Sequence, residues 1–203
     1  MRAPVVCSAP RCAGRWLACM AICVAAAGSD PLLAAEKVNL TFTPQDQTFA
    51  AAAEAYRLLW EDEGAKIVEA MERGSGLKFV EHDIKAVIFE GASSSGFGAT
   101  PMQLRASYPA DVKKATLVHE LGHRLMAQLR KRPADLDEHR ILFLYLYDVW
   151  ESLWGKAFAD DQVTVESGRK GLYDYETAWK WARSIGKEER AARFAEIVKA
   201  NRK

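Results

Sequence analysis

The stretch TLVHELGHRL, residues 116–125, carries two periodic patterns at once. Leucines recur at every fourth position through it and beyond, at 117, 121, 125 and 129, which predicts one buried stripe of an α-helix. His119 and His123 have the same spacing and therefore project together from one face of that helix. We expect this helix to run from about Pro109 to about Arg130.

Two imidazoles one helical turn apart can bind a single tetrahedral Zn²⁺ at about 2.0–2.1 Å. Glu120 is rotated by one residue from the histidines, so it lies close to such a metal without joining their line. A carboxylate in that place can take a proton from zinc-bound water and later deliver it to a leaving group. Gly122 leaves one side of the helix bare, which lets another backbone or side chain approach closely. The spacing therefore predicts a metal-dependent hydrolase with His119 and His123 as ligands and Glu120 as general base.

Residues 116–125 resemble the active-site helix of the zincin metallopeptidases, which carry an HExxH motif. Arg124 departs from that pattern, since such helices usually have an uncharged residue there. By the order of elements the resemblance extends over about residues 77–155. It implies a small mixed sheet before the helix, whose edge strand binds an extended peptide or protein substrate antiparallel. Residues 102–107 are the natural candidate for that edge strand.

The metzincin branch of these peptidases is excluded. Its pattern continues with glycine three residues and histidine six residues after the second motif histidine, where this chain has Met126 and Leu129. A third metal ligand must therefore come from elsewhere, as in the gluzincin and aspzincin branches, where a downstream carboxylate serves.

Four downstream side chains could supply that ligand: Glu138, His139, Asp148 and Glu151. Asp148 is favoured because it interrupts an apolar run, where an unpaired carboxylate is costly. If two helices pack antiparallel around a turn at 131–136, the level facing His123 also lies near residues 144–148. His139 is a chemically good zinc ligand, but that packing places it opposite about Gln128 and not opposite His123. Two other roles for Asp148 stay open as well, namely a salt bridge and a hydrogen bond that orients a zinc histidine.

The N-terminus has the pattern of a secretory signal. Three arginines at positions 2, 11 and 15 precede an apolar, alanine-rich run at 16–27, with possible cleavage sites after Ala27 or Ala35. The run is too short to span a bilayer comfortably. Cys19 and Cys23 do not follow the usual lipobox, so a lipoprotein is the less favoured alternative. We therefore expect residues 1–35 to be a signal peptide and residues 36–203 to be one domain, periplasmic or secreted.

Composition narrows the chemistry of that domain. Residues 1–35 contain three of the 28 basic and one of the 27 acidic side chains, so the rest has 25 against 26, a net charge of about −1. A balance of this kind gives no reason to expect nucleic acid or an anionic membrane as a partner. All four cysteines lie in the leader, which excludes thiolate zinc ligands and cysteine nucleophiles from the domain.

Hydrophobic periodicity predicts an α+β fold with a mainly helical C-terminal half. The expected strands are 38–43, 77–80, 84–89 and 102–107; the expected helices are 45–72, 109–130, one capped by Asp135 or Asp137, 157–166, 173–185 and 187–201. Residues 91–98, rich in serine and glycine, are expected to form a loop.

The sequence as a whole predicts an exported zinc metallopeptidase in which His119, His123 and Asp148 bind Zn²⁺. The alternative is a non-catalytic zinc-binding or interaction module with a structural metal site. A structural site would have four protein ligands and no open position.

Overall fold

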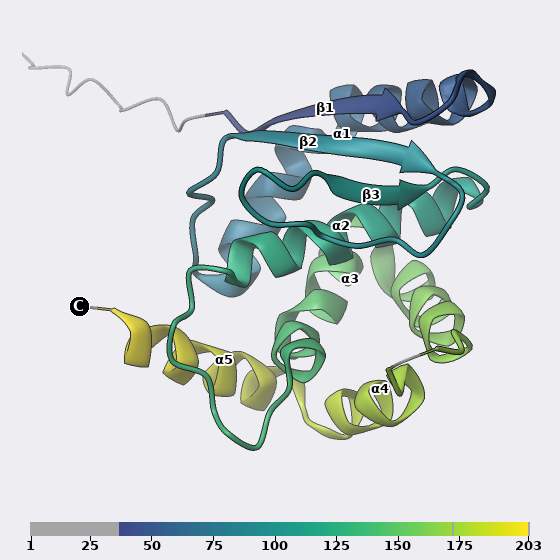
Figure 1. Cartoon of the computed structure of the whole chain (residues 1–203). Helices are drawn as coiled ribbons and strands as arrows, with labels where there is room; N and C mark the ends of the chain where they lie inside the picture. Colours follow the sequence, from purple (N-terminus) through teal and green to yellow (C-terminus); the bar gives the residue numbers. More distant parts are fainter. Residues whose placement is uncertain (1–36, 172, 203) are drawn as a thin grey trace, which may run out of the picture. The chain divides into compact units, whose positions relative to one another are not determined.

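The computed structural model describes residues 37–171 and 173–202 (Figure 1). Its elements are β1 (Asn39–Pro44), the 3₁₀ turn η1 (Gln47–Phe49), α1 (Ala50–Ser75), β2 (Asp83–Phe89), β3 (Met102–Arg105), α2 (Ala110–Met126), α3 (Glu138–Ser167), α4 (Tyr175–Ser184) and α5 (Lys187–Asn201). The prediction of an α+β fold with a helical C-terminal half is confirmed. The expected signal peptide, 1–35, lies outside the described residues. Within them, no helix is both long and apolar enough to cross a membrane.

The sheet has three strands in the order β1-β2-β3, and both pairings are parallel. The prediction of a mixed sheet is therefore wrong. Parallel neighbours need a connection that returns to the starting end. Helix α1 makes that return between β1 and β2, and residues 90–101 make it between β2 and β3. The antiparallel pairing in the described residues is an isolated bridge between Ser94 and Gln103, on the outer edge of β3.

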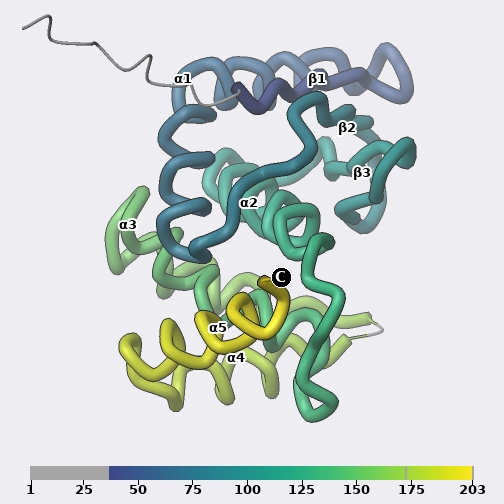
Figure 2. The backbone as a smooth tube through the Cα atoms, turned by 90° about the vertical axis from the view of Figure 1, so that its left-hand side faces the viewer, coloured from purple at the N-terminus to yellow at the C-terminus, as the bar shows by residue number. Residues whose placement is uncertain are grey.

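One face of the sheet is packed against helices. Alternate residues of β2 and β3 are buried, namely Ile84, Ala86, Ile88, Met102 and Leu104. Helix α2 lies next to β3 on this face, between the sheet and α3 (Figure 1). Helix α1 runs along the sheet and continues past α2 to α3 (Figure 2). Because alternate residues of the strands point to one face, and α2 packs between that face and α3, the motif helix lies in the core.

The predicted strand at 77–80 does not form. Its backbone groups are bonded to side chains instead of to a neighbouring strand. The Glu72 carboxylate accepts from the N–H of Phe79 at 3.1 Å, and the Gln128 amide donates to the carbonyl of Lys78 at 2.9 Å. The segment therefore serves as a connection tied to the ends of α1 and α2.

Helices α2 and α3 approach each other closely at Gly122. A Cβ atom built there would lie 2.5 Å from Leu142 Cδ1 and 3.1 Å from the Tyr145 hydroxyl. Tyr145 also donates a hydrogen bond of 3.3 Å to the Gly122 carbonyl. The bare helix side expected from the sequence is thus occupied by α3, whose residues 141–147 are buried nearly all round, as their apolar run predicts.

Helix α3 begins after an aspartate cap and is interrupted at a glycine. Asp137 caps it, accepting from the N–H of Arg140 at 2.9 Å. Gly155 interrupts it with a φ of 87°, so the predicted helix at 157–166 is its second half. Helices α4 and α5 correspond to the two predicted at 173–185 and 187–201.

We predict that Gly122→Ala destabilises the protein by about 2 kcal/mol, because Leu142 or the helix backbone must shift to admit the methyl group. Urea denaturation of the variant and the parent protein measures this. Gly168→Ala is the matched control, since Gly168 has a φ of −76° and its added Cβ meets only ordinary contacts from 3.5 Å. Equal stability of the two variants would contradict the close approach of α2 and α3.

Candidate metal centre

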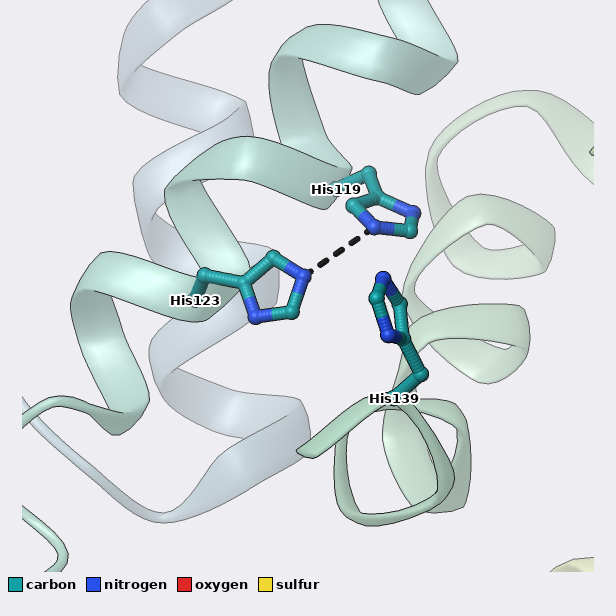
Figure 3. Close-up of side chains that lie close together, drawn as sticks. All are labelled: His119, His123 and His139. Atoms are coloured by element: carbon teal, nitrogen blue, oxygen red, sulfur yellow. Dashed lines mark hydrogen bonds between the residues drawn. The ribbon is translucent and has the colours of Figure 1, made fainter. Parts of the chain in front are cut away.

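His119 and His123 lie one turn apart on α2, and both are buried. Their Nε2 atoms face each other at 3.2 Å (Figure 3). Two nitrogens bound to one tetrahedral Zn²⁺ lie about 3.3 Å apart when each bond is about 2.05 Å long. The spacing of the two imidazoles therefore already suits a shared metal ion.

His139, in the first turn of α3, is the third member of the group. One ligand nitrogen from each of the three histidines lies within 4.8 Å of the others, and the three rings converge in Figure 3. Tyr173 stacks on the His139 ring with centroids 4.1 Å apart. Burial, together with the charges of His119 and His123, lowers the pKa of His139 to about 3. His139 is therefore neutral at pH 7, which is the form that binds a metal.

Two carboxylates hold the opposite nitrogens of the motif histidines. Glu166, near the end of α3, lies 2.9 Å from His119 Nδ1, and Glu138 lies 3.2 Å from His123 Nδ1. Burial alone would lower the pKa of His119, but the charge and hydrogen bond of Glu166 outweigh it and raise that pKa. When the proton is on Nδ1, the lone pair that can bind a metal is on Nε2. Carboxylate–histidine pairs of this kind fix the tautomer and the orientation of metal-binding imidazoles.

Glu166 is itself fully buried and held from three sides. Trp179 donates its indole N–H to Glu166 at 3.0 Å. The Arg169 guanidinium lies 3.4 Å from Glu166 Oε1, the carboxylate oxygen that also faces His119. Burial opposes ionisation, yet the charges of His119 and Arg169 and these hydrogen bonds hold the pKa of Glu166 below its usual value. The carboxylate therefore stays charged beside His119.

Glu120 lines the same cleft as the three histidines and is 5% exposed. Burial raises the pKa of Glu120, against the opposing charges of His119 and His123. A raised pKa brings a carboxylate closer to the range in which it both accepts and returns a proton. The cleft is also lined by Ser93, Ser94, Ser95, Phe97 and Tyr175.

Asp148 does not lie with the histidines. It forms an ion pair with Arg190, whose guanidinium contacts both carboxylate oxygens at 2.8 and 2.9 Å. Nine residues separate Asp148 from His139, which on an α-helix is about two and a half turns and about 13.5 Å. The two side chains therefore project from opposite sides of α3.

The expected facing level was misplaced because α2 ends at Met126, four residues before the predicted Arg130. The connection to α3 is correspondingly longer and spans residues 127–137. The first turn of α3 is thereby level with His123, so His139 replaces Asp148 as the candidate third ligand. Of the remaining candidates, Glu138 contacts His123 at Nδ1, the nitrogen that faces away from His119, and Glu151 pairs with Lys187 at 3.1 Å.

The spacing of the motif did not predict that Glu166 and Tyr175 lie at this centre. Tyr175 follows the α3–α4 loop, and its hydroxyl lies 3.2 Å from His139 Nε2. Burial and the charge of Glu166 raise the pKa of Tyr175 to about 12, so its hydroxyl keeps its proton at neutral pH. Both residues are more than 25 positions from the histidine they contact, and only tertiary packing brings them there.

We predict that His139→Ala lowers zinc affinity more than about 100-fold, whereas Asp148→Asn leaves it unchanged. Asp148→Asn is instead expected to lower the free energy of unfolding by about 2 kcal/mol, since Arg190 is buried and loses its counter-charge. Competition with a chromogenic chelator measures the affinity, and urea denaturation the stability. If Asp148→Asn lost zinc and His139→Ala kept it, Asp148 and not His139 would be the third ligand.

Glu166→Gln is expected to weaken zinc binding by about 10–100-fold without removing a ligand, because His119 loses the charge that orients it. Titration of the metal-free protein with Zn²⁺ measures this. Glu151→Gln, which alters a carboxylate on the surface of the same helix, is the control. Equal affinities for the two variants would contradict the orienting role of Glu166.

Comparison with known proteins found no family model that matches this chain, and no curated protein or solved structure that matches it.

Proposed function

We propose that this protein is an exported zinc-dependent metallopeptidase. His119, His123 and His139 bind the metal, and Glu120 is the general base. The observation that carries the proposal is the convergence of three imidazoles from two helices on a cleft that Glu120 also lines.

The donor set suits zinc. Imidazole nitrogens are among its preferred ligands, and three protein ligands with one open position are typical of catalytic zinc. In the described part of the chain, the group of side chains able to hold a metal consists of the three histidines, without a fourth member. This favours a catalytic site over the closed structural site of the alternative hypothesis.

Zinc, when bound, lowers the pKa of a coordinated water towards about 7 and polarises a substrate carbonyl. Glu120 accepts the proton of the attacking water and returns it to the leaving amine, for which its raised pKa is suited. Tyr175 is protonated and lines the cleft, so its hydroxyl can donate a hydrogen bond to the oxygen that becomes negative. Glu166 and Glu138 hold the imidazoles in place throughout.

A peptide substrate would lie along the Ser93–Ser95 side of the cleft. The outer edge of β3, within the 102–107 segment expected to bind it, is already paired at Gln103. The Ser94 and Gln103 backbones exchange hydrogen bonds of 2.9 and 2.8 Å. An extended chain would therefore not pair with β3 at Gln103 and would instead run beside the segment that lines the cleft.

We predict that Glu120→Gln keeps about one zinc per chain and loses hydrolysis of fluorescent casein by at least about 10³-fold. The amide cannot accept the proton, while the ligands remain in place. Zinc is measured by atomic emission and turnover by release of labelled peptides, with the secreted, naturally processed protein as reference.

Unchanged turnover in the Glu120 variant would overturn the general-base role. A parent protein that binds no zinc under zinc-replete conditions would overturn the metal centre. Zinc bound so that no added ligand can reach it would favour the structural module.

A further inference from the structure

The segment at residues 93–98 forms one wall of the histidine cleft and is attached to the sheet. Besides the two backbone hydrogen bonds between Ser94 and Gln103, the Ser93 hydroxyl accepts from the N–H of Arg105 at 3.2 Å. Sequence composition alone predicts a flexible loop here, yet these contacts tie its first half to the edge of β3.

Arg124 attaches the same segment to the motif helix. Its side chain is 2% exposed, donates to the carbonyl of Ser95 at 2.7 Å and to that of Thr100 at 2.8 Å, and pairs with Glu81. Arg124 directly follows the ligand His123, so one turn of α2 positions both the metal centre and the cleft wall. This explains the charged residue where the resembling helices carry an uncharged one.

Two glycines set the shape of the wall around Phe97. Gly96 and Gly98 have φ values of 54° and 57°, which other residues rarely adopt. A Cβ atom on Gly96 would lie 2.3 Å from the Pro101 carbonyl oxygen, so only glycine fits there. The Thr100 N–H closes the turn on the Phe97 carbonyl at 3.0 Å.

This turn presents Phe97 at the cleft with 49% of its surface exposed. The large apolar side chains that are similarly exposed in the described residues are Leu58, Val80 and Val165. None of these three lines the cleft of the histidines. Phe97 thus adds an aromatic face to a cleft whose other lining residues are polar or ionisable.

We propose that Phe97 is the specificity-determining residue of this site and selects ligands that carry an apolar side chain next to the metal-binding group. The inference rests on the proposed metal centre and names the class of substrate it takes, a polypeptide with an aromatic or large aliphatic residue beside the scissile bond. Contact with such a side chain buries the exposed ring and adds an aromatic or apolar pair. The Arg124 contacts hold the backbone on both sides of Phe97 in place before the ligand arrives, which lowers the entropic cost of binding.

Three hydroxamates test this on the zinc-loaded protein by calorimetry: acetohydroxamate, 3-phenylpropanohydroxamate and the monohydroxamate of succinic acid. All three share the metal-binding group and differ in the attached chain. We expect the phenyl compound to bind about tenfold more tightly than acetohydroxamate, and the succinic compound to show no such gain.

Phe97→Ala is expected to remove most of the tenfold preference and to leave the zinc content and the affinity for acetohydroxamate unchanged. Phe97→Leu should retain part of it, since the side chain stays apolar. Leu58→Ala, which truncates an equally exposed apolar residue on α1, is the matched control and should retain all of it.

The outcomes separate the inference from the function on which it rests. If acetohydroxamate does not bind to the zinc-loaded protein, the open metal position fails, and with it the proposed function. If acetohydroxamate binds but the phenyl compound gains nothing, or if Phe97→Ala keeps the full preference, the role of Phe97 is overturned while the metal centre stands.

Discussion

The candidate site depends on the close packing of α2 against α3 at Gly122. Because no side chain separates the helices there, Leu142 and Tyr145 rest directly on the backbone of the motif helix. The first turn of α3 is thereby brought level with His123, and His139 meets the two motif histidines. A side chain at position 122 would move α3 outwards and open the group, since packed interiors have little room to adapt.

Buried charge is the second constraint on this centre. Three imidazoles and the Glu120 carboxylate lie together in a region with little access to water, which is costly unless each group has a partner. Glu166 and Glu138 provide partners for His119 and His123, the Tyr175 hydroxyl contacts His139, and Trp179 and Arg169 in turn stabilise the charge of Glu166. The histidines are therefore oriented by side chains from α3 and α4 as much as by the helix that carries the motif.

The small parallel sheet contributes mainly through what lies at its edge. Strand β3 supports α2 from one side and pairs through Gln103 with the segment that borders the cleft. Arg124 joins that segment to α2 from the other direction. The cleft wall and the two motif histidines are consequently fixed to one helix, so their separation is set by the core and not by the freedom of a serine- and glycine-rich loop.

The sequence alone determined what depends on local periodicity. The four-residue spacing of leucines and histidines specified α2, its buried stripe and the pairing of His119 with His123, because an α-helix brings such positions to one face. Hydrophobic patterning predicted β1, β2 and β3, and Asp135 or Asp137 was expected to cap the helix that Asp137 begins. Only the tertiary structure decided the strand directions and the third histidine, which depend on where α2 ends and how α3 crosses it. The partners Glu166 and Tyr175 were likewise decided by packing, since nothing in their local sequence distinguishes a carboxylate or hydroxyl that meets an imidazole from one that meets solvent.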